Sequence, residues 1–283
     1  MNAAQSIALS EIARRAALGG GAVALAGFRT EGLAADEKAD FHDLVTEYDR
    51  RSEERVREII EREAPGSVIV GEEGGVTGDG EVTWYIDPID GTSNFARGIA
   101  LWGVCVAAAV DGEVVAGVVY DPVADHVFQA DARGAFLNGA ALTARGQTRP
   151  QRATILASFP LPRDLVHFKE RALEAYAELE LDYAAVRDFG SSAISLCHVA
   201  AGWADATFAF EANPWDVAAP AFILRVAGGQ YRTYGGGEQL QERSDHLHRH
   251  YFGAVRDADF PLIDVIMREQ SLRPVPSLAT VTQ

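Results

Sequence analysis

The chain has 283 residues, of which 48% are hydrophobic and 23% are charged, and its formal net charge is −16. This length is enough for one large domain or two packed ones. The acidic charge argues against a nucleic-acid-binding surface, which is normally basic, and disfavours direct anion binding unless metal cations lie between protein and ligand. Cys105 and Cys197 lie in apolar stretches. We expect both to be buried free thiols, as suits a reducing compartment such as the cytoplasm.

The first predicted element is a helix over residues 5–28, weakened in its middle by three consecutive glycines that start at Gly19. A twin-arginine export signal is the alternative, because Arg14 and Arg15 precede an apolar stretch. The acidic Glu11 before the arginines and the glycines inside the stretch favour the helix. No apolar stretch in the sequence is long enough to span a membrane, so no membrane partner is expected.

The next segments predict an antiparallel sheet flanked by two helices. A helix over residues 46–64 is rich in helix formers, with Thr46 as its N-cap. A short strand at 67–70 runs into a glycine loop, and residues 74–81 have the polar composition of a loop. Alternating apolar residues and turn signals then predict a strand, a meander and a small hairpin, over residues 82–86, 101–110, 113–122, 126–132 and 134–142.

The pattern changes near Pro150, where strands and helices begin to alternate. Strands are predicted over 153–159, 184–190, 204–210 and 230–236, and helices over 161–179, 191–204 and 215–229. The strand at 230–236 is expected to be the last, before a variable region. This alternation indicates an α/β second half. We therefore divide the chain into an α+β half at residues 1–149 and an α/β half at 150–283.

Two carboxylates close a buried strand in the stretch WYIDPID, at Asp87 and Asp90. Mg²⁺ takes oxygen ligands and shares carboxylates with substrate phosphates. Pro88 fixes the backbone between the aspartates, so both side chains can point into one space, and the carbonyl of Ile89 becomes available as a neutral oxygen ligand. The alternative interpretation is an aspartate N-cap beside a second surface aspartate.

The residues directly after these aspartates suit a phosphate. Gly91 and Thr92 can open a helix, and the free N–H groups at a helix start attract phosphate. One short stretch therefore predicts both metal ligands and a phosphate-binding seat.

Further acidic residues strengthen this prediction. Glu72 and Glu73 follow the apolar strand in VGEEGG, and Asp216 stands at the head of an apolar helix in PWDVAAP. Thr46 and Asp49 open the second predicted helix. For Asp216 the alternative is a helix cap, which is compatible with metal binding, and any one of these sites alone is weak evidence.

These stretches together resemble the motifs of a known family. KADFHDLVTEYD, VGEEGG, WYIDPIDGTSNF and PWDVAAP are similar, in order and spacing, to those of the inositol monophosphatase family, and the similarity runs from about residue 5 to about residue 260. The family comprises lithium-sensitive, magnesium-dependent phosphatases and is related to the fructose-1,6-bisphosphatases. The resemblance implies a layered αβαβα sandwich, usually a homodimer, that acts on a small phosphate monoester.

The resemblance also implies a set of metal ligands for two or three Mg²⁺ ions. Glu72, Asp87 and the carbonyl of Ile89 match the ligands of the first metal. Asp87, Asp90 and Asp216 match those of the second. Glu72 matches the residue that holds a weaker third metal through water.

The same resemblance assigns the remaining catalytic roles. Asp49 and Thr92 match the pair that orients and activates the attacking water, and Lys38 matches a lysine near the metal-bound water. The backbone of Gly91 and Thr92 would cradle the phosphate. The water would attack phosphorus in line, without a phosphoenzyme intermediate, so no serine, cysteine or histidine nucleophile is required.

The substrate end of the motif set departs from the family pattern. Members that act on inositol carry a glutamate in the strand before the WD motif, and here that position is Ala209. Glu211 lies two residues on and would share the same face of a strand, so it could substitute. Gly190, Ser191 and Ser192 match the segment that contacts substrate hydroxyls.

Inositol-1-phosphate is the first expected substrate, followed by histidinol phosphate, sugar bisphosphates such as fructose-1,6-bisphosphate, and 3′-phosphonucleotides. Trp102 has a counterpart in some histidinol-phosphate phosphatases, although a core aromatic in a strand is the favoured interpretation. His246, His248 and His250 are interpreted as a solvated surface turn rather than a metal site. A metal-free binding or regulatory protein is the alternative of another class, but such a relative would be expected to lose a ligand carboxylate.

Overall fold

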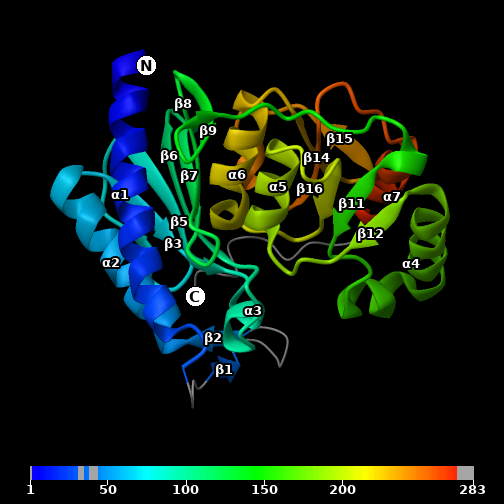
Figure 1. Ribbon diagram of the computed structural model, residues 1–283, viewed down its shortest axis with the longest axis horizontal. Coiled ribbons are helices and arrows are strands. Elements are labelled where there is room, and N and C mark those ends of the chain that lie inside the picture. Colours follow the sequence, from blue (N-terminus) through cyan, green and yellow to red (C-terminus); the bar gives the residue numbers. More distant parts are fainter. Residues whose placement is uncertain (1, 31–34, 38–43, 273–283) are drawn as a thin grey trace.

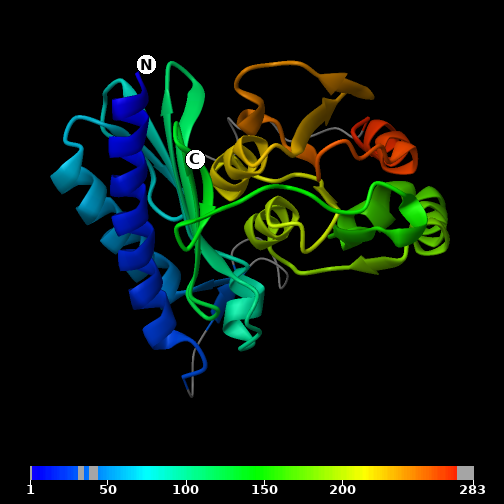
Figure 2. The same cartoon turned by 45° about the horizontal axis from the view of Figure 1, so that its top comes forward.

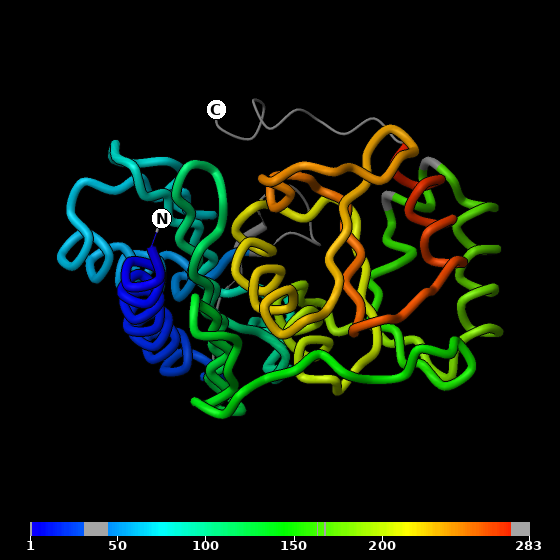
Figure 3. Tube along the Cα trace, turned by 90° about the horizontal axis from the view of Figure 1, so that it is seen from above, coloured from blue at the N-terminus to red at the C-terminus, as the bar shows by residue number. Residues whose placement is uncertain are grey.

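The computed structural model describes residues 2–30, 35–37 and 44–272 and stacks helices and sheets in alternating layers (Figure 1). In order, the layers are α1 (Ala3–Gly27) with α2 (Glu47–Glu63), a first sheet, α5 (Ser192–Ala200) with α6 (Pro214–Val226), a second sheet, and α4 (Pro162–Asp182) with α7 (Pro261–Gln270). Figure 2 shows α5 and α6 between the two sheets, and in Figure 3 α1 and α7 lie toward opposite ends of the molecule. The predicted αβαβα sandwich is confirmed.

The first sheet contains the strands of the N-terminal half. They are β3 (Val68–Gly71), β4 (Gly75–Thr77), β5 (Val82–Asp90), β6 (Gly103–Val110), β7 (Glu113–Asp121), β8 (His126–Asp131), β9 (Gly134–Leu137) and β10 (Ala140–Ala141). Their order in the sheet is β10-β9-β8-β7-β6-β5-β3-β4, antiparallel except for the parallel pair β3 and β5. The meander and the hairpin are confirmed, but the loop predicted over residues 74–81 is wrong in part, because β4 pairs with β3 there. A separate ribbon joins β1 (Ala35–Glu37) to β2 (Leu44–Thr46).

The second sheet mixes parallel and antiparallel strands. They are β11 (Thr154–Ala157), β12 (Ala185–Arg187), β13 (Ala206–Ala209), β14 (Gln230–Gly235), β15 (Glu238–Leu240) and β16 (His250–Ala254), in the order β12-β11-β13-β16-β14-β15. The prediction that β14 is the last strand is wrong, because β16 enters the sheet between β13 and β14 and α7 follows it. The boundary at residue 149 separates the two sheets, and whether the halves are independent domains stays a prediction.

The glycines in the middle of α1 have a packing role. A Cβ atom on Gly20 would lie 2.6 Å from Cγ2 of Val56 on α2, and one on Gly21 would lie 2.5 Å from Cδ1 of Tyr120 on β7. The glycines therefore allow α1 to approach α2 and the sheet closely, although glycine lowers the intrinsic stability of the helix. The apolar core is completed between the sheets, where Cys105 and Cys197 are buried free thiols, as predicted.

The histidine-rich stretch is a correction to the sequence prediction. His246 and His250 are 3% and 2% exposed, so this segment is not a solvated surface turn. His246 lies in a short 3₁₀ helix (Asp245–Leu247) and packs edge-on against the ring of Tyr85, with 4.9 Å between ring centroids. Burial lowers the pKa of His246 to about 4. Within the described ranges no helix has the length and apolarity that a membrane span requires.

Candidate active site

The start of α2 brings Asp49 and Thr92 together, although they are 43 residues apart in sequence. Thr46 caps the helix, and its backbone N–H and hydroxyl both donate to Oδ2 of Asp49, over 2.8 and 2.6 Å. The other carboxylate oxygen, Oδ1, lies 3.0 Å from the hydroxyl of Thr92. Asp49 is fully buried, so the capping box holds an ionisable group in one orientation against Thr92.

The end of β5 presents the two aspartates of the DPID stretch. Asp87 pairs with Cys105 and Asp90 with Gly103 on β6, so four residues of β5 lie opposite three of β6 and the strand bulges there. Asp87 and Asp90 are 2% and 8% exposed. The N–H of Ile89 donates to Oδ1 of Asp87 over 2.9 Å. The bulge thus brings both carboxylates to the buried end of one strand, where the sequence predicted them.

The N-terminus of α5 holds the carboxylate of Asp90. The hydroxyl of Ser191 and the N–H of Ala193 both donate to Oδ2 of Asp90, the latter over 2.8 Å. Burial raises the pKa of Asp90 to about 6, and the hydrogen bonds from Ser191, Ala193 and the N–H of Ser192 oppose this rise. Ser191 was predicted to contact substrate hydroxyls, whereas its hydroxyl bonds to a predicted metal ligand in this structure. The hydroxyl of Ser192 is hydrogen-bonded to Tyr251.

Neighbouring carboxylates help to raise the pKa of two of the acidic side chains predicted as metal ligands, Asp87 and Asp216. The pKa of Asp87 lies well above its ordinary value because of burial and then because of the negative charges of Glu72, Asp90 and Asp216. The pKa of Asp216 is raised well above its ordinary value by burial, then by Asp90 and Glu72. Glu72 is half-buried in the turn between β3 and β4. These like charges lie within electrostatic range of one another, and a cation among them would favour the ionised form of each.

The four carboxylates lie near one another but are not arranged around a single point as the ligands of a bound metal would be. Across the described ranges, no group of three or more His, Cys, Asp or Glu side chains is already arranged to hold a metal ion. Asp216 also accepts a hydrogen bond from the N–H of Asn213 at the start of α6, over 2.7 Å. The donor chemistry fits Mg²⁺, because carboxylates and one backbone carbonyl offer oxygen only. The ligand assignment stays a prediction.

The residues predicted to form a phosphate seat lie where β5 turns into a short helix. Gly91 has a φ of 100° and precedes the five-residue helix α3 (Thr92–Ala96). A Cβ atom on Gly91 would lie 2.9 Å from the carbonyl oxygen of Leu101, so glycine is required there. The amide of Asn94 donates to the carbonyl oxygens of Leu101 and Phe189, each over 2.7 Å. Sequence reasoning missed Asn94, which ties α3 to the segment just before Gly190.

The predicted substrate residues are only partly brought to the site. Gly190 has a φ of 61° and its N–H donates to Asp188 over 2.8 Å. Glu211 does not share a strand face with Ala209, because β13 ends at Ala209 and Glu211 has a φ of 62°. The N–H of Glu211 donates to Nδ1 of His250 over 3.2 Å, and its carbonyl accepts from Arg249 over 3.1 Å. The same-face argument for Glu211 was therefore wrong, and its substrate contact stays a prediction.

Trp102 is fully buried beside Phe95, with ring centroids 5.0 Å apart at 90°, and it lies just before β6 rather than within a strand. The structure thus supports a core role for Trp102. Lys38 lies outside the described residues, so its predicted place beside the attacking water stays a prediction.

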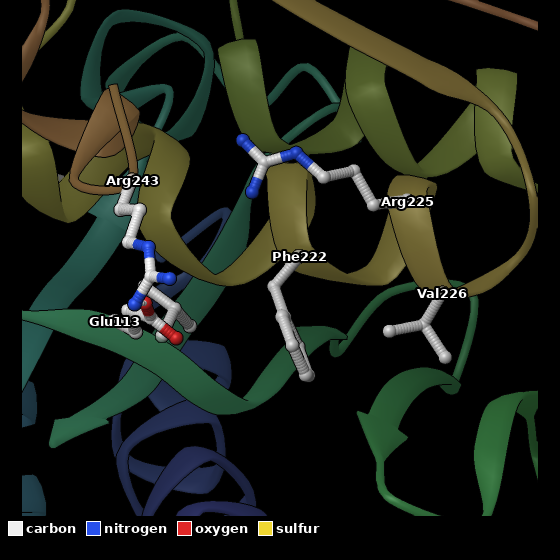
Figure 4. A pocket seen from close by; sticks show the side chains of 6 residues that line it. Glu113, Phe222, Arg225, Val226 and Arg243 are labelled. Atoms are coloured by element: carbon white, nitrogen blue, oxygen red, sulfur yellow. Dashed lines mark hydrogen bonds and ion pairs between the residues drawn. The ribbon is translucent and has the colours of Figure 1, made fainter. Parts of the chain in front are cut away.

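A cavity of about 350 Å³ lies away from these carboxylates (Figure 4). Phe222 and Val226, which line it, project from the last turns of α6, and Arg243 lies beside Glu113. Asp216 is in the first turn of α6, and nine helical residues rise about 13 Å, so Asp216 and Arg225 stand at opposite ends of the helix. Arg225, which also lines the cavity, pairs with Asp245, and none of the four predicted acidic ligands lines this cavity.

Comparisons with known proteins agree with this geometry. The profile of the inositol monophosphatase family matches residues 8–256. The "Fructose-1,6-bisphosphatase/inositol-1-monophosphatase" of Aquifex aeolicus is 34% identical over 229 residues, which cover 80% of this chain and 85% of that protein. "Nus factor SuhB" of Escherichia coli is 34% identical over 230 residues, with the same coverage. The solved inositol monophosphatase from Anabaena superposes with a TM-score of 0.73 at 28% identity, covering 96% of this chain and 97% of that one.

Proposed function

The chain belongs to the inositol monophosphatase family, and we propose that it is a Mg²⁺-dependent phosphomonoesterase that hydrolyses a small polyol phosphate, with inositol-1-phosphate as the first candidate. One observation carries the proposal. The buried Asp49 contacts the half-buried Thr92, whose hydroxyl also lies 3.0 Å from the carbonyl oxygen of Ile89, between the two carboxylates that close β5. A group that can accept a proton thus adjoins an all-oxygen, negatively charged site.

The metal-binding part of the proposal assigns five oxygen donors. Glu72, Asp87, Asp90, Asp216 and the carbonyl of Ile89 would hold two or three Mg²⁺ ions. Bound Mg²⁺ would lower the pKa of a water molecule and stabilise charge on the attacking and leaving oxygens. The raised pKa values of Asp87 and Asp216 support this role, because a bound cation would offset the repulsion that their carboxylate neighbours exert on them.

Asp49 and Thr92 would then orient the attacking water. Thr46 occupies Oδ2 of Asp49, which leaves Oδ1 for the Thr92 hydroxyl. That hydroxyl has a single proton and two acceptors at 3.0 Å, namely Asp49 Oδ1 and the carbonyl of Ile89. When the proton is donated to Asp49, a lone pair of the Thr92 oxygen can accept a hydrogen bond from water. The proton released on attack would pass along this pair.

The phosphate would sit at the N–H groups of Gly91 and Thr92. The positive φ of Gly91 turns the chain from β5 into α3, so the backbone N–H groups at that turn are not used by the strand. Lys38 would lie near the attacking water, and Gly190, Ser191, Ser192 and Glu211 would form the substrate end. We also propose that the protein is a cytoplasmic homodimer, as the family resemblance implies.

The identity of the alcohol depends on the substrate end. Ala209 provides no carboxylate for ring hydroxyls, which keeps histidinol phosphate, fructose-1,6-bisphosphate and 3′-phosphonucleotides as alternatives. A non-catalytic role is disfavoured, because all four predicted acidic ligands are present.

A screen of phosphate release tests the proposal. Purified protein with Mg²⁺ is assayed on inositol-1-phosphate, histidinol phosphate, fructose-1,6-bisphosphate, a 3′-phosphonucleotide and p-nitrophenyl phosphate, with Asp90→Asn as the background. We expect the largest kcat/KM on inositol-1-phosphate. A larger value on another ester would reassign the substrate, and release no faster than the Asp90→Asn background on every ester would refute the enzymatic function.

A further inference from the structure

The buried face of α2 carries polar side chains that reach three different segments of the site. Asp49, Ser52 and Glu53 are each 2% exposed or less, although the helix is rich in charged residues. Asp49 contacts Thr92, and the hydroxyl of Ser52 donates to the carbonyl of Pro88 over 3.2 Å. Glu53 reaches the turn between β3 and β4. The proposed chemistry uses Asp49, whereas it gives no role to Glu53.

Glu53 binds the backbone that directly follows Glu72. Its Oε2 accepts the N–H of Glu73 over 2.8 Å, and its Oε1 accepts the N–H of Gly74 over 2.7 Å. Both bonds involve an ionised acceptor and are therefore stronger than neutral ones. They fix the peptide groups on the C-terminal side of Glu72, which is the proposed ligand of the first metal.

Arg57, one turn further along α2, completes the clamp. Its Nε donates to Oε1 of Glu53 over 2.8 Å, and the side chains of this ion pair are only 13% and 3% exposed. Nη1 donates to the hydroxyl of Thr77 over 2.8 Å, and Nη2 donates to the carbonyl of Gly75 over 2.7 Å. Arg57 thus neutralises Glu53 and binds the far side of the same turn, where β4 begins.

The glycines on both sides of Glu72 make room for this clamp. A Cβ atom on Gly71 would lie 2.5 Å from Oε1 of Glu53, and one on Gly74 would lie 2.7 Å from it. The carboxylate therefore packs directly against bare backbone before and after Glu72. The GEEGG turn has little freedom to move while Glu53 and Arg57 are in place.

We propose that Glu53, paired with Arg57, is a positioning residue that holds Glu72 in reach of the first metal. This inference rests on the proposed function, because it takes Glu72 as a ligand. The clamp restrains a negatively charged residue close to Asp87 and Asp216, whose charges repel it. Without the clamp, the turn would relax away from those charges, and metal binding would have to draw it back.

Mg²⁺ binding by isothermal titration calorimetry tests this role. Wild type, Glu53→Gln and the control Glu54→Gln are compared at a temperature at which all three are fully folded. Glutamine keeps the size of Glu53 but cannot accept both N–H groups as a carboxylate does. Groups that orient metal ligands typically contribute 10- to 100-fold to affinity, so we expect the Kd of Glu53→Gln to rise by about that factor. Glu54 is exposed on the same helix, so its variant removes the same charge without touching the turn, and its Kd should stay close to that of wild type.

Each outcome of the titrations either supports or overturns the positioning role of Glu53. A Kd for Glu53→Gln equal to wild type, even with a lowered thermal midpoint in EDTA, would show that Glu53 is only structural and would overturn the proposal. An equal rise in both variants would attribute the effect to net charge and also overturn it. Wild type that binds no Mg²⁺ would refute the proposed function itself. If Glu53→Gln does not fold, Arg57→Lys, which keeps the charge and loses the bonds to Thr77 and Gly75, must show the weakened Mg²⁺ binding.

Discussion

Asp90→Asn should abolish turnover and leave the fold intact. Asp90 is proposed as a ligand of the second metal, and the amide that replaces it carries no charge. A bound metal contributes several kcal/mol of transition-state stabilisation, and each 1.36 kcal/mol corresponds to a tenfold change in rate. We therefore expect phosphate release to fall by about a hundredfold to a thousandfold or more.

The structure indicates that the same change does not destabilise the metal-free protein. Burial raises the pKa of Asp90 to about 6, so the folded state loses stability as the pH rises from 3.8 through that value. The ionised carboxylate then costs on the order of 3 kcal/mol at neutral pH. This cost already includes the opposing bonds from Ser191 and Ala193, because they contribute to the pKa of about 6. Asparagine removes the cost, and its amide oxygen can accept the same two bonds, so the variant should be no less stable than wild type.

The assay combines two measurements. Phosphate release is measured with Mg²⁺, and the thermal midpoint is measured with EDTA. Asp79→Asn is the matched control, because Asp79 is an exposed aspartate in the loop before β5, and it should behave like wild type in both. Activity of Asp90→Asn within tenfold of wild type would refute the two-metal assignment. A large drop in its midpoint in EDTA would instead show that Asp90 is a structural N-cap of α5.

Three other changes have defined outcomes. Li⁺ should inhibit Mg²⁺-supported turnover, as the family resemblance implies, and undiminished activity at high Li⁺ would contradict this. The pKa of His246 is about 4 in the folded state and 6.5 in the unfolded state, so its contribution to stability is present above pH 6.5 and is lost as the pH falls toward 4. His246→Leu should therefore reduce the acid-induced loss of stability by about 3 kcal/mol. A variant whose stability depends on pH as that of wild type does would contradict the burial argument. Glu211→Gly, in which glycine suits the positive φ, should lower kcat/KM for the best polyol phosphate about ten- to a hundredfold and leave kcat/KM for p-nitrophenyl phosphate unchanged. If the variant hydrolyses the polyol phosphate as fast as wild type does, Glu211 does not belong to the site.

The parts of the site that are close in sequence could be predicted from it. Asp87, Asp90, Gly91 and Thr92 fall within six residues at the end of one strand, so the covalent chain alone places them together. The N-cap role of Thr46 was predictable for the same reason, because a cap acts within one helical turn.

Contacts between distant segments could not be predicted in this way. The bond from Ser191 to Asp90 joins residues 101 apart, and only the packing of α5 against the first sheet creates it. The error at Glu211 arose because β13 ends at Ala209, two residues before Glu211, so the alternation of side chains along a strand does not extend to Glu211. β16 was missed because its histidine-rich approach has the composition of a surface turn, although His250 and all the strand residues after it are buried.

Chelation and restoration of activity test the central claim most directly. The protein is dialysed against EDTA and then into metal-free buffer, and phosphate release from inositol-1-phosphate is measured before and after Mg²⁺ is added. We expect release to disappear on chelation and to return with Mg²⁺ in wild type but not in Asp90→Asn. Full activity after exhaustive chelation would contradict the assignment of these carboxylates as the metal-binding centre of a phosphatase.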